Sequence, residues 1–240
     1  MNILRTIVWF IYFFLVLLFM LPMRIKADKM KKNGDKAAYP YIFKKVKWWA
    51  NSLLKLAGVE ITVYGRENIP TDCAVVFTPN HSGLYDIPVM LTCCNEPPAL
   101  VAKKESKKIP LVGGWMHLLD CLYIDRENPR AAAATMNEAA QLVMDGRNLV
   151  IFPEGTRSKT GELGEFKHGA FKMAFKAKAP IVPVVIEGTR DIMENHHNIM
   201  TPGKVTVRFL PPIYTADLDR AAQKLLPEEI KRMIEANKGM

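Results

Sequence analysis

The stretch AVVFTPNHSGLYDIPVML, residues 74–91, joins an apolar run to a turn and the start of a helix. The apolar run predicts a buried β-strand that ends at Pro79, and Gly83 favours a turn. A helix is expected to begin near Leu84, because Pro88 is tolerated only in the first turn of a helix. This order of strand, turn and helix is typical of an α/β fold.

Similar apolar runs recur through the chain after residue 58. They predict strands over residues 59–64, 73–78, 98–102, 119–124, 148–152, 181–186 and 204–210. A helix is expected over residues 129–145 and a short charged helix over residues 227–238, while short gaps elsewhere indicate a mixed sheet. Residues 59–240 are therefore expected to form a single α/β domain, with a mixed, mostly parallel sheet flanked by helices.

His81 and Asp86 lie five positions apart, beside the predicted turn. On a regular helix such residues point about 140° away from each other, so they can meet only if the turn folds the imidazole back over the carboxylate. A carboxylate bound to one ring nitrogen fixes the tautomer and orientation of a neutral histidine, which can then take a proton from a hydroxyl. The alternative is a helix-capping aspartate beside a buried histidine.

The sequence FPEGTRS, residues 152–158, follows another predicted buried strand, which ends at Pro153. Open α/β sheets bind ligands at the carboxyl ends of their strands. Arg157 offers a planar set of donors that suits a phosphate, Gly155 lets the backbone approach a ligand closely, and Thr156 adds a hydroxyl. The alternative is an ordinary turn with a surface arginine.

Together, NHSGLYD at 80–86 and VIFPEGTRS at 150–158 resemble the glycerolipid acyltransferase family, most closely the bacterial 1-acyl-glycerol-3-phosphate acyltransferases. LYIDR at 122–126 and APIVPVVI at 179–186 are similar to two further blocks, and the resemblance runs from about residue 59 to residue 212. It implies transfer of an acyl chain from acyl-CoA or acyl-carrier protein to the sn-2 hydroxyl of 1-acyl-glycerol 3-phosphate (lysophosphatidic acid), giving phosphatidic acid in phospholipid biosynthesis. No metal, no cofactor and no covalent enzyme intermediate are implied.

The resemblance also implies roles for individual residues. His81 would be the general base and Asp86 its orienting partner. Lys103, Arg126 and Arg157 would contact the acceptor phosphate. The other residues implied in substrate binding are Glu154, Gly155 and Thr156, with the first two at the glycerol end of the acceptor. One departure is Asp120, which stands where the family usually has glycine.

Other functions stay open at this point. The acceptor can be glycerol 3-phosphate or another lysophospholipid, and water in its place would make the protein a hydrolase. A non-enzymatic scaffold that binds anionic lipid on the same fold is a further alternative.

The cysteines give no sign of a competing nucleophile. Cys73 and Cys121 lie in apolar runs and are expected to be buried, and adjacent Cys93 and Cys94 have no metal-site spacing. Four cysteines without a disulfide pattern indicate a reducing compartment.

The amino-terminal segment, residues 1–58, is expected to anchor the protein to a membrane. Residues 3–21 are apolar and long enough to enter a bilayer, and a cleaved signal peptide is the alternative. Residues 24–55 hold ten Lys or Arg against two acids, which predicts the cytoplasmic face of a cell membrane, in bacteria the inner membrane. Residues 39–57, with Trp48 and Trp49, predict a basic amphipathic helix in the headgroup layer, or else a packed core helix.

The net charge of +9 is concentrated beside this apolar segment, and no aromatic-basic RNA motif accompanies it. Anionic membrane lipid is therefore the expected partner, and nucleic acid is not.

Overall fold

A seven-stranded sheet crosses the computed structural model, which describes residues 2–239. The strand order is β1-β7-β6-β2-β5-β3-β4, and among these neighbours only β6 and β7 run antiparallel. The predicted mixed, mostly parallel sheet is thus confirmed. The strands are β1 (Val59–Tyr64), β2 (Val76–Pro79), β3 (Ala99–Lys103), β4 (Leu122–Ile124), β5 (Leu149–Val150), β6 (Ile181–Glu187) and β7 (Gly203–Phe209).

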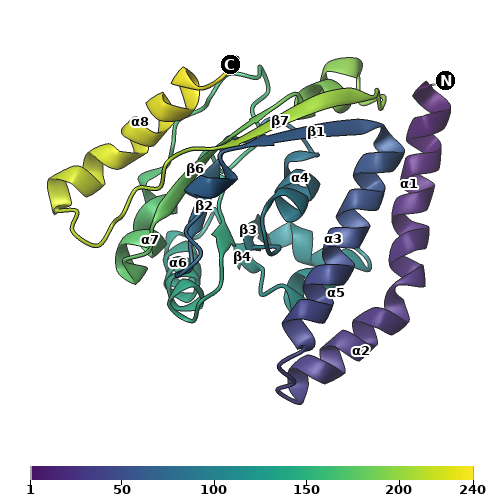
Figure 1. Cartoon of the computed structure of the whole chain (residues 1–240), viewed down its shortest axis with the longest axis horizontal. Coiled ribbons are helices and arrows are strands. Elements are labelled where there is room, and N and C mark those ends of the chain that lie inside the picture. The colour runs from purple at the N-terminus through teal and green to yellow at the C-terminus, as the bar shows by residue number, and fades with distance from the viewer. Residues whose placement is uncertain (1, 240) are drawn as a thin grey trace.

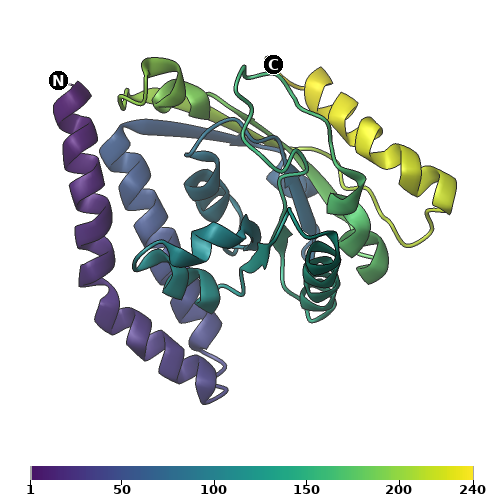
Figure 2. The same cartoon turned by 180° about the vertical axis from the view of Figure 1, so that it is seen from behind.

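Helices cover both faces of this sheet (Figure 1). Helices α1 to α5 lie on one side and α6 to α8 on the other, and the reverse view in Figure 2 shows the same two layers. The helices are α1 (Asn2–Phe19), α2 (Leu21–Lys32), α3 (Ala38–Ala57), α4 (Asp86–Cys93), α5 (Val112–Leu118), α6 (Pro129–Met144), α7 (Lys172–Ala177) and α8 (Arg220–Ala236).

The two cores follow from the alternation of side chains along a strand. Val75 and Phe77 belong to the core shared with α1, α3 and α4, whereas Val76 belongs to the core beneath α6, α7 and α8. All three side chains are buried, which explains the continuous apolar run in the sequence.

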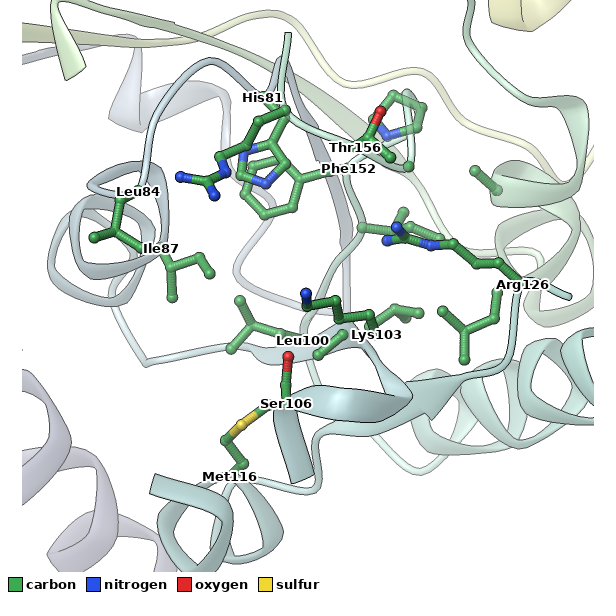
Figure 3. Close-up of a pocket in the computed structure, with 18 of the residues that line it drawn as sticks. His81, Leu84, Ile87, Leu100, Lys103, Ser106, Met116, Arg126, Phe152 and Thr156 are labelled. Carbon is green, nitrogen blue, oxygen red and sulfur yellow. The ribbon is translucent and has the colours of Figure 1, made fainter. Parts of the chain in front are cut away.

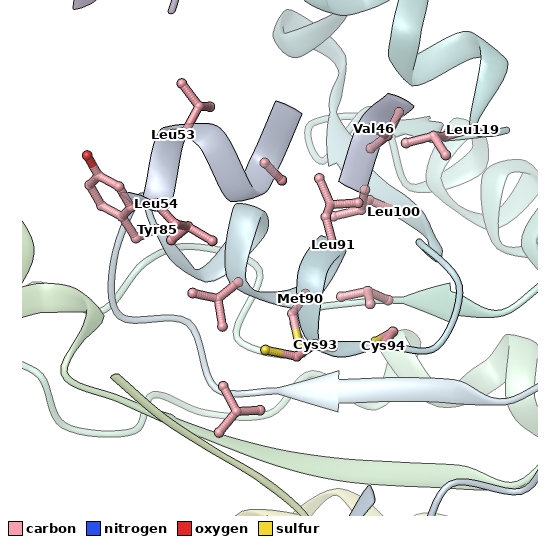
Figure 4. Close-up of a cluster of buried hydrophobic side chains, with 14 of the residues drawn as sticks. Val46, Leu53, Leu54, Tyr85, Met90, Leu91, Cys93, Cys94, Leu100 and Leu119 are labelled. Atoms are coloured by element: carbon pink, nitrogen blue, oxygen red, sulfur yellow. The ribbon is translucent and has the colours of Figure 1, made fainter. Parts of the chain in front are cut away.

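Helix α3 packs against protein along its apolar face. Figure 4 shows side chains of α4 lying between α3 and the strands, with Leu53 and Leu54 of α3 close to Tyr85. On this face α3 is the packed core helix that the sequence offered as the alternative to a helix in the headgroup layer. Packing against α4 removes its apolar side chains from water, as insertion between lipids would. Trp48, which is 49% exposed, lies outside this contact.

The starts of α4 and α8 differ from the prediction, and α2 was not predicted. Helix α4 begins at Asp86 instead of Leu84, which still leaves Pro88 in its first turn. Helix α8 begins at Arg220, seven residues before the expected start at Pro227, because the Asp219 side chain accepts a hydrogen bond from the Ala222 N–H and caps the helix. Helix α2 was not predicted at all, since its basic sequence has little apolar periodicity.

The parallel strands place the motif residues at one edge of the sheet. Strands β6, β2, β5, β3 and β4 are parallel neighbours, so their carboxyl ends lie side by side. His81 follows β2, Phe152 follows β5, Lys103 ends β3, and Arg126 follows β4. This edge is therefore the place to look for a site.

Candidate active site

A cavity of about 1380 Å³ lies at this edge. Figure 3 shows the side chains of Lys103 and Arg126 extending into it from below and from the side, with His81 above. The predicted site residues that line the cavity are His81, Lys103, Arg126, Gly155, Thr156 and Arg157. The other two, Asp86 and Glu154, are buried behind this lining.

The turn after β2 folds His81 back over Asp86, as predicted. The ring nitrogen Nδ1 of His81 lies 2.7 Å from Oδ2 of Asp86, whose side chain is fully buried. The same oxygen accepts the backbone N–H groups of Ser82 at 2.7 Å and Gly83 at 2.9 Å. The other oxygen, Oδ1, accepts the Thr189 hydroxyl at 2.5 Å. Four donors therefore fix this carboxylate in the turn.

This contact decides which nitrogen of His81 carries the proton in the neutral ring. A carboxylate oxygen only accepts hydrogen bonds, so Nδ1 must carry the hydrogen and Nε2 keeps its lone pair. Phe152 stacks on the face of the imidazole ring, with centroids 4.0 Å apart and planes at 25°. His81 thus offers a proton acceptor at the cavity in a fixed orientation.

Gly83 allows the turn to pack closely. A β-carbon at this position would lie 3.0 Å from both the carbonyl carbon and oxygen of Thr189, which is backbone that cannot easily yield. Asn80 fixes the same turn from the other side, since its side chain exchanges two 2.8 Å hydrogen bonds with the backbone of Ile186 in β6. The positioning contacts of Asn80 and Thr189 were not predicted from the sequence, although Asn80 stands next to His81 in the quoted motif.

Glu154 does not face the cavity. Its Oε1 accepts the backbone N–H of His81 at 2.7 Å and its Oε2 accepts that of Gly164 at 3.0 Å. The side chain is 6% exposed, so both carboxylate oxygens are used inside the protein. The residue ties the loop after β5 to the loop that carries His81.

The cations at the cavity differ in their partners. Arg157 forms an ion pair with Glu194, with Nη1 and Oε1 3.0 Å apart. Arg190 donates from Nη1 to the Ser158 carbonyl at 2.8 Å and so supports the loop that carries Arg157. Glu194 and Arg190 follow β6, and no motif in the sequence marked them.

Asp120 adopts the backbone conformation that favours glycine, with φ at +61°. This accounts for the glycine expected at this position. Its side chain forms ion pairs with Lys31 of α2 and with Arg147, and accepts the Tyr39 hydroxyl of α3 at 2.9 Å. Burial, followed by the bond to Asp120, raises the pKa of Tyr39 to about 12. Asp120 thus joins α2 and α3 to the domain.

The thiols lie away from this chemistry. Burial raises the pKa of Cys93 and Cys94, and that of Cys121 to about 12. Cys73 is exposed, so the expectation that it is buried was wrong: β2 begins only at Val76. Among the described residues that line the cavity there is no cysteine, and residues 2–239 contain no group of acidic, histidine and cysteine side chains arranged to hold a metal ion.

Helix α1 is long and apolar enough to cross a membrane, with a mean hydropathy of 2.1 over 18 residues. It nevertheless contacts the rest of the protein, because the Trp9 indole N–H donates to the Leu53 carbonyl at 2.9 Å and Thr6 accepts the Met200 N–H at 2.8 Å. Its opposite side exposes large apolar side chains, among them Ile7 and Ile11.

Comparisons with known proteins agree with the site. The acyltransferase family profile matches residues 60–187. The chain is 36% identical over 203 residues to a probable 1-acyl-sn-glycerol-3-phosphate acyltransferase of Mycoplasma pneumoniae, covering 80% of this chain and 76% of that protein. It is 37% identical to the 1-acyl-sn-glycerol-3-phosphate acyltransferase of Cocos nucifera, covering 69% of this chain and 53% of that protein.

A solved structure is similar over the whole chain. The crystal structure of the 1-acyl-sn-glycerophosphate acyltransferase of Thermotoga maritima has a TM-score of 0.83 and 27% sequence identity, covering 100% of this chain and 99% of that one. The similarity therefore includes the N-terminal helices as well as the sheet.

Proposed function

The chain belongs to the acyltransferase family, and we propose that it transfers a fatty acyl chain to the sn-2 hydroxyl of 1-acyl-sn-glycerol 3-phosphate, forming phosphatidic acid. One observation carries this proposal: the oriented His81, held by Asp86 at 2.7 Å, faces a cavity that also holds Lys103 and Arg126. A general base and a phosphate-binding group are the parts that the reaction needs.

The reaction follows from these positions. Lys103, Arg126 and Arg157 bind the acceptor phosphate, and Nε2 of His81 takes the proton of the sn-2 hydroxyl as its oxygen attacks the thioester carbonyl carbon. The tetrahedral intermediate then loses the thiolate, which takes the proton from the imidazolium. Asp86 stabilises that imidazolium, and a positioned base of this kind contributes about 10²- to 10⁴-fold in rate. We assign Glu154 and Asn80 to positioning the His81 loop.

We assign the phosphate-bearing end of the acyl donor to the part of the cavity lined by α6 and α7. Met136 of α6 and Lys172 and Lys176 of α7 line it, and both lysines are exposed. Acyl-CoA and the phosphopantetheine of acyl-carrier protein both carry phosphate, which suits these cations. Replacing both lysines by glutamate should raise the KM for the donor and leave that for the acceptor unchanged. Parallel assays with acyl-CoA and acyl-carrier protein distinguish the two sources.

We propose that residues 1–58 attach the catalytic part, residues 59–240, to the cytoplasmic face of the membrane. The supporting observation is that α1 contacts α3 through Trp9 and the catalytic part through Thr6, which accepts the Met200 N–H, and exposes ten large apolar side chains elsewhere on its surface. Because those contacts would be lost if α1 stood alone across a bilayer, we infer that it lies in one leaflet. The lysines of α2 and α3 then contact anionic headgroups.

Vesicle sedimentation tests this attachment. Ile11→Glu should weaken binding to anionic vesicles, whereas Leu225→Glu should not, because Leu225 lies on distant α8, although it is 64% exposed against 55% for Ile11. Equal binding by both variants would contradict the orientation proposed for α1.

The activity test uses purified protein in detergent with labelled acyl-CoA or acyl-carrier protein. Phosphatidic acid formed from lysophosphatidic acid by the unaltered protein, and reduced at least about 100-fold in His81→Ala, is the expected result. Product from glycerol 3-phosphate instead would change the acceptor, and free fatty acid released without an acceptor would indicate a hydrolase. Lipid binding with no transfer from either donor would leave the scaffold function.

A further inference from the structure

Lys167 lines the active-site cavity from the segment between β5 and α7. Its backbone N–H donates to the Pro153 carbonyl at 3.0 Å, which fixes it beside the loop after β5. The preceding Phe166 is 3% exposed and belongs to the core beneath α6, α7 and α8. The backbone of Lys167 is therefore held in place on both sides of the residue, although its side chain is exposed.

The side chain of Lys167 passes over Gly155. A β-carbon at position 155 would lie 3.3 Å from Nζ, 3.6 Å from Cε and 3.7 Å from Cδ of Lys167. The space that a larger residue would fill is thus occupied by the end of the lysine side chain. Gly155 also has a φ of +77°, which favours glycine. The glycine of the motif therefore admits an ammonium group beside the loop that carries Thr156 and Arg157.

The charges at this cavity are strongly unbalanced. The described residues that line it include eight Lys or Arg and one acid, Glu194, which forms an ion pair with Arg157. Within residues 2–239, no ion pair is recorded for Lys167. A cleft lined by one sign of charge raises the local concentration of ligands of the opposite sign. The ammonium group of Lys167 is thus available to an anion that enters the cavity.

We propose that Lys167 binds a phosphate group of a substrate, an inference that rests on the proposed function. Its ammonium group has three donors and no acceptor, which suits phosphate oxygens. Two sources supply that chemistry, since both the acceptor and the acyl donor carry phosphate. Lys167 adjoins the residues assigned to each: its side chain lies over Gly155, two positions before Arg157, and its backbone leads into α7, which carries Lys172.

Lys167→Met tests this role, because methionine keeps an unbranched side chain over Gly155 and removes the charge. Initial rates, measured with one substrate varied at a time, give separate KM values for lysophosphatidic acid and for the acyl donor. We expect the KM of the substrate whose phosphate is bound to rise up to about fivefold, as for the loss of an exposed ion pair. The value of kcat and the thermal unfolding temperature should stay unchanged, because the contact is made equally before and during the reaction.

The two KM values distinguish the sources. A rise for lysophosphatidic acid alone assigns Lys167 to the acceptor phosphate, and a rise for the donor alone assigns it to the donor phosphate. The matched control Lys224→Met changes the net charge equally at an exposed lysine of α8 and should leave both KM values unchanged. Unchanged KM values in a folded Lys167→Met protein, or a fall in kcat alone, would overturn the inference.

A second measurement uses the unaltered protein and therefore does not depend on the folding of a variant. Lysines are acetylated with an N-hydroxysuccinimide ester, and the modified positions are quantified by mass spectrometry. Lysophosphatidic acid or coenzyme A, added separately, should slow acetylation of Lys167 but not that of Lys224. Monoacylglycerol, which has the acyl chain without the phosphate, should give no protection. Equal protection of Lys167 by monoacylglycerol, or none by either phosphate compound, would contradict the role in phosphate binding.

These results are distinct from those for the proposed function. No phosphatidic acid from lysophosphatidic acid with either donor would overturn the function itself. Normal synthesis with unchanged KM values in Lys167→Met would overturn only the role of Lys167.

Discussion

Replacing Asp86 by asparagine removes the charge of this side chain but not its hydrogen bonds. Oδ2 accepts three N–H groups, so the amide oxygen must take its place, because an NH₂ group there would face three donors. The NH₂ group then faces the Thr189 hydroxyl, which can accept a hydrogen bond as well as donate one. Asp86→Asn is therefore expected to fold normally and to keep the Nδ1–H tautomer of His81.

The size of the effect follows from the lost charge. A hydrogen bond to a charged group contributes about 1.5–3 kcal/mol and a neutral one about 0.5–1.5 kcal/mol, so the imidazolium formed in the reaction loses about 1–2 kcal/mol. This difference corresponds to a fall in kcat of about 5- to 30-fold, with little change in KM. Asp86→Ala instead leaves the N–H groups of Ser82 and Gly83 unsatisfied in the interior, which costs about 1–3 kcal/mol of stability each.

Initial rates of thiol release from acyl-CoA with lysophosphatidic acid, measured beside thermal unfolding in detergent, check both variants. Unaltered activity in Asp86→Asn would show that the charge of Asp86 is not used. A loss above about 10³-fold in a folded Asp86→Asn protein would show that the tautomer of His81 changes, and would refute the reasoning from three donors on Oδ2.

Three further predictions concern single positions. Gly83→Ala places a β-carbon 3.0 Å from the Thr189 carbonyl, so activity should fall at least about tenfold as the turn moves, measured by the same rate assay. Asp120→Gly removes a strained φ of +61° but also three side-chain contacts, so the free energy of unfolding from denaturant titration should decrease by about 1–3 kcal/mol. Cys73 is exposed, and partial desolvation and the neighbouring Asp72 carboxylate raise the pKa of its thiol. It should be the thiol that maleimide labels in the native protein, faster as pH rises towards 9 and without loss of activity, as shown by mass spectrometry.

The contact between His81 and Asp86 was predictable because its cause is local. His81 and Asp86 are five positions apart, with a glycine in the turn between them and a proline in the first turn of the helix that follows. This arrangement lets the two side chains meet only if the turn folds one back over the other. The sheet was predictable for a similar reason: strands buried on both faces give continuous apolar runs, and short connections limit their order.

Contacts between distant segments were not predictable in this way. Glu194 lies 37 residues after Arg157 in a polar loop and has no motif of its own, so only the parallel order of β6, β2 and β5 brings the two together. The role of Glu154 at the glycerol end of the acceptor was inferred from the family resemblance alone. Its two backbone donors, His81 and Gly164, become visible only when the loops are packed.

The N-terminal helices, to which we assign the attachment to the membrane, also line the cavity of the active site. Leu17 and Met20, at the end of α1 and just after it, and Trp49 of α3 line the same cavity as His81. Because α1 also carries the exposed apolar side that we place in one leaflet, an acyl chain can pass from lipid to the cavity along apolar surface. The ion pair with Lys31 and the hydrogen bond from Tyr39 hold α2 and α3 against Asp120, so this aspartate helps to keep the apolar lining from the N-terminal helices beside the catalytic edge of the sheet.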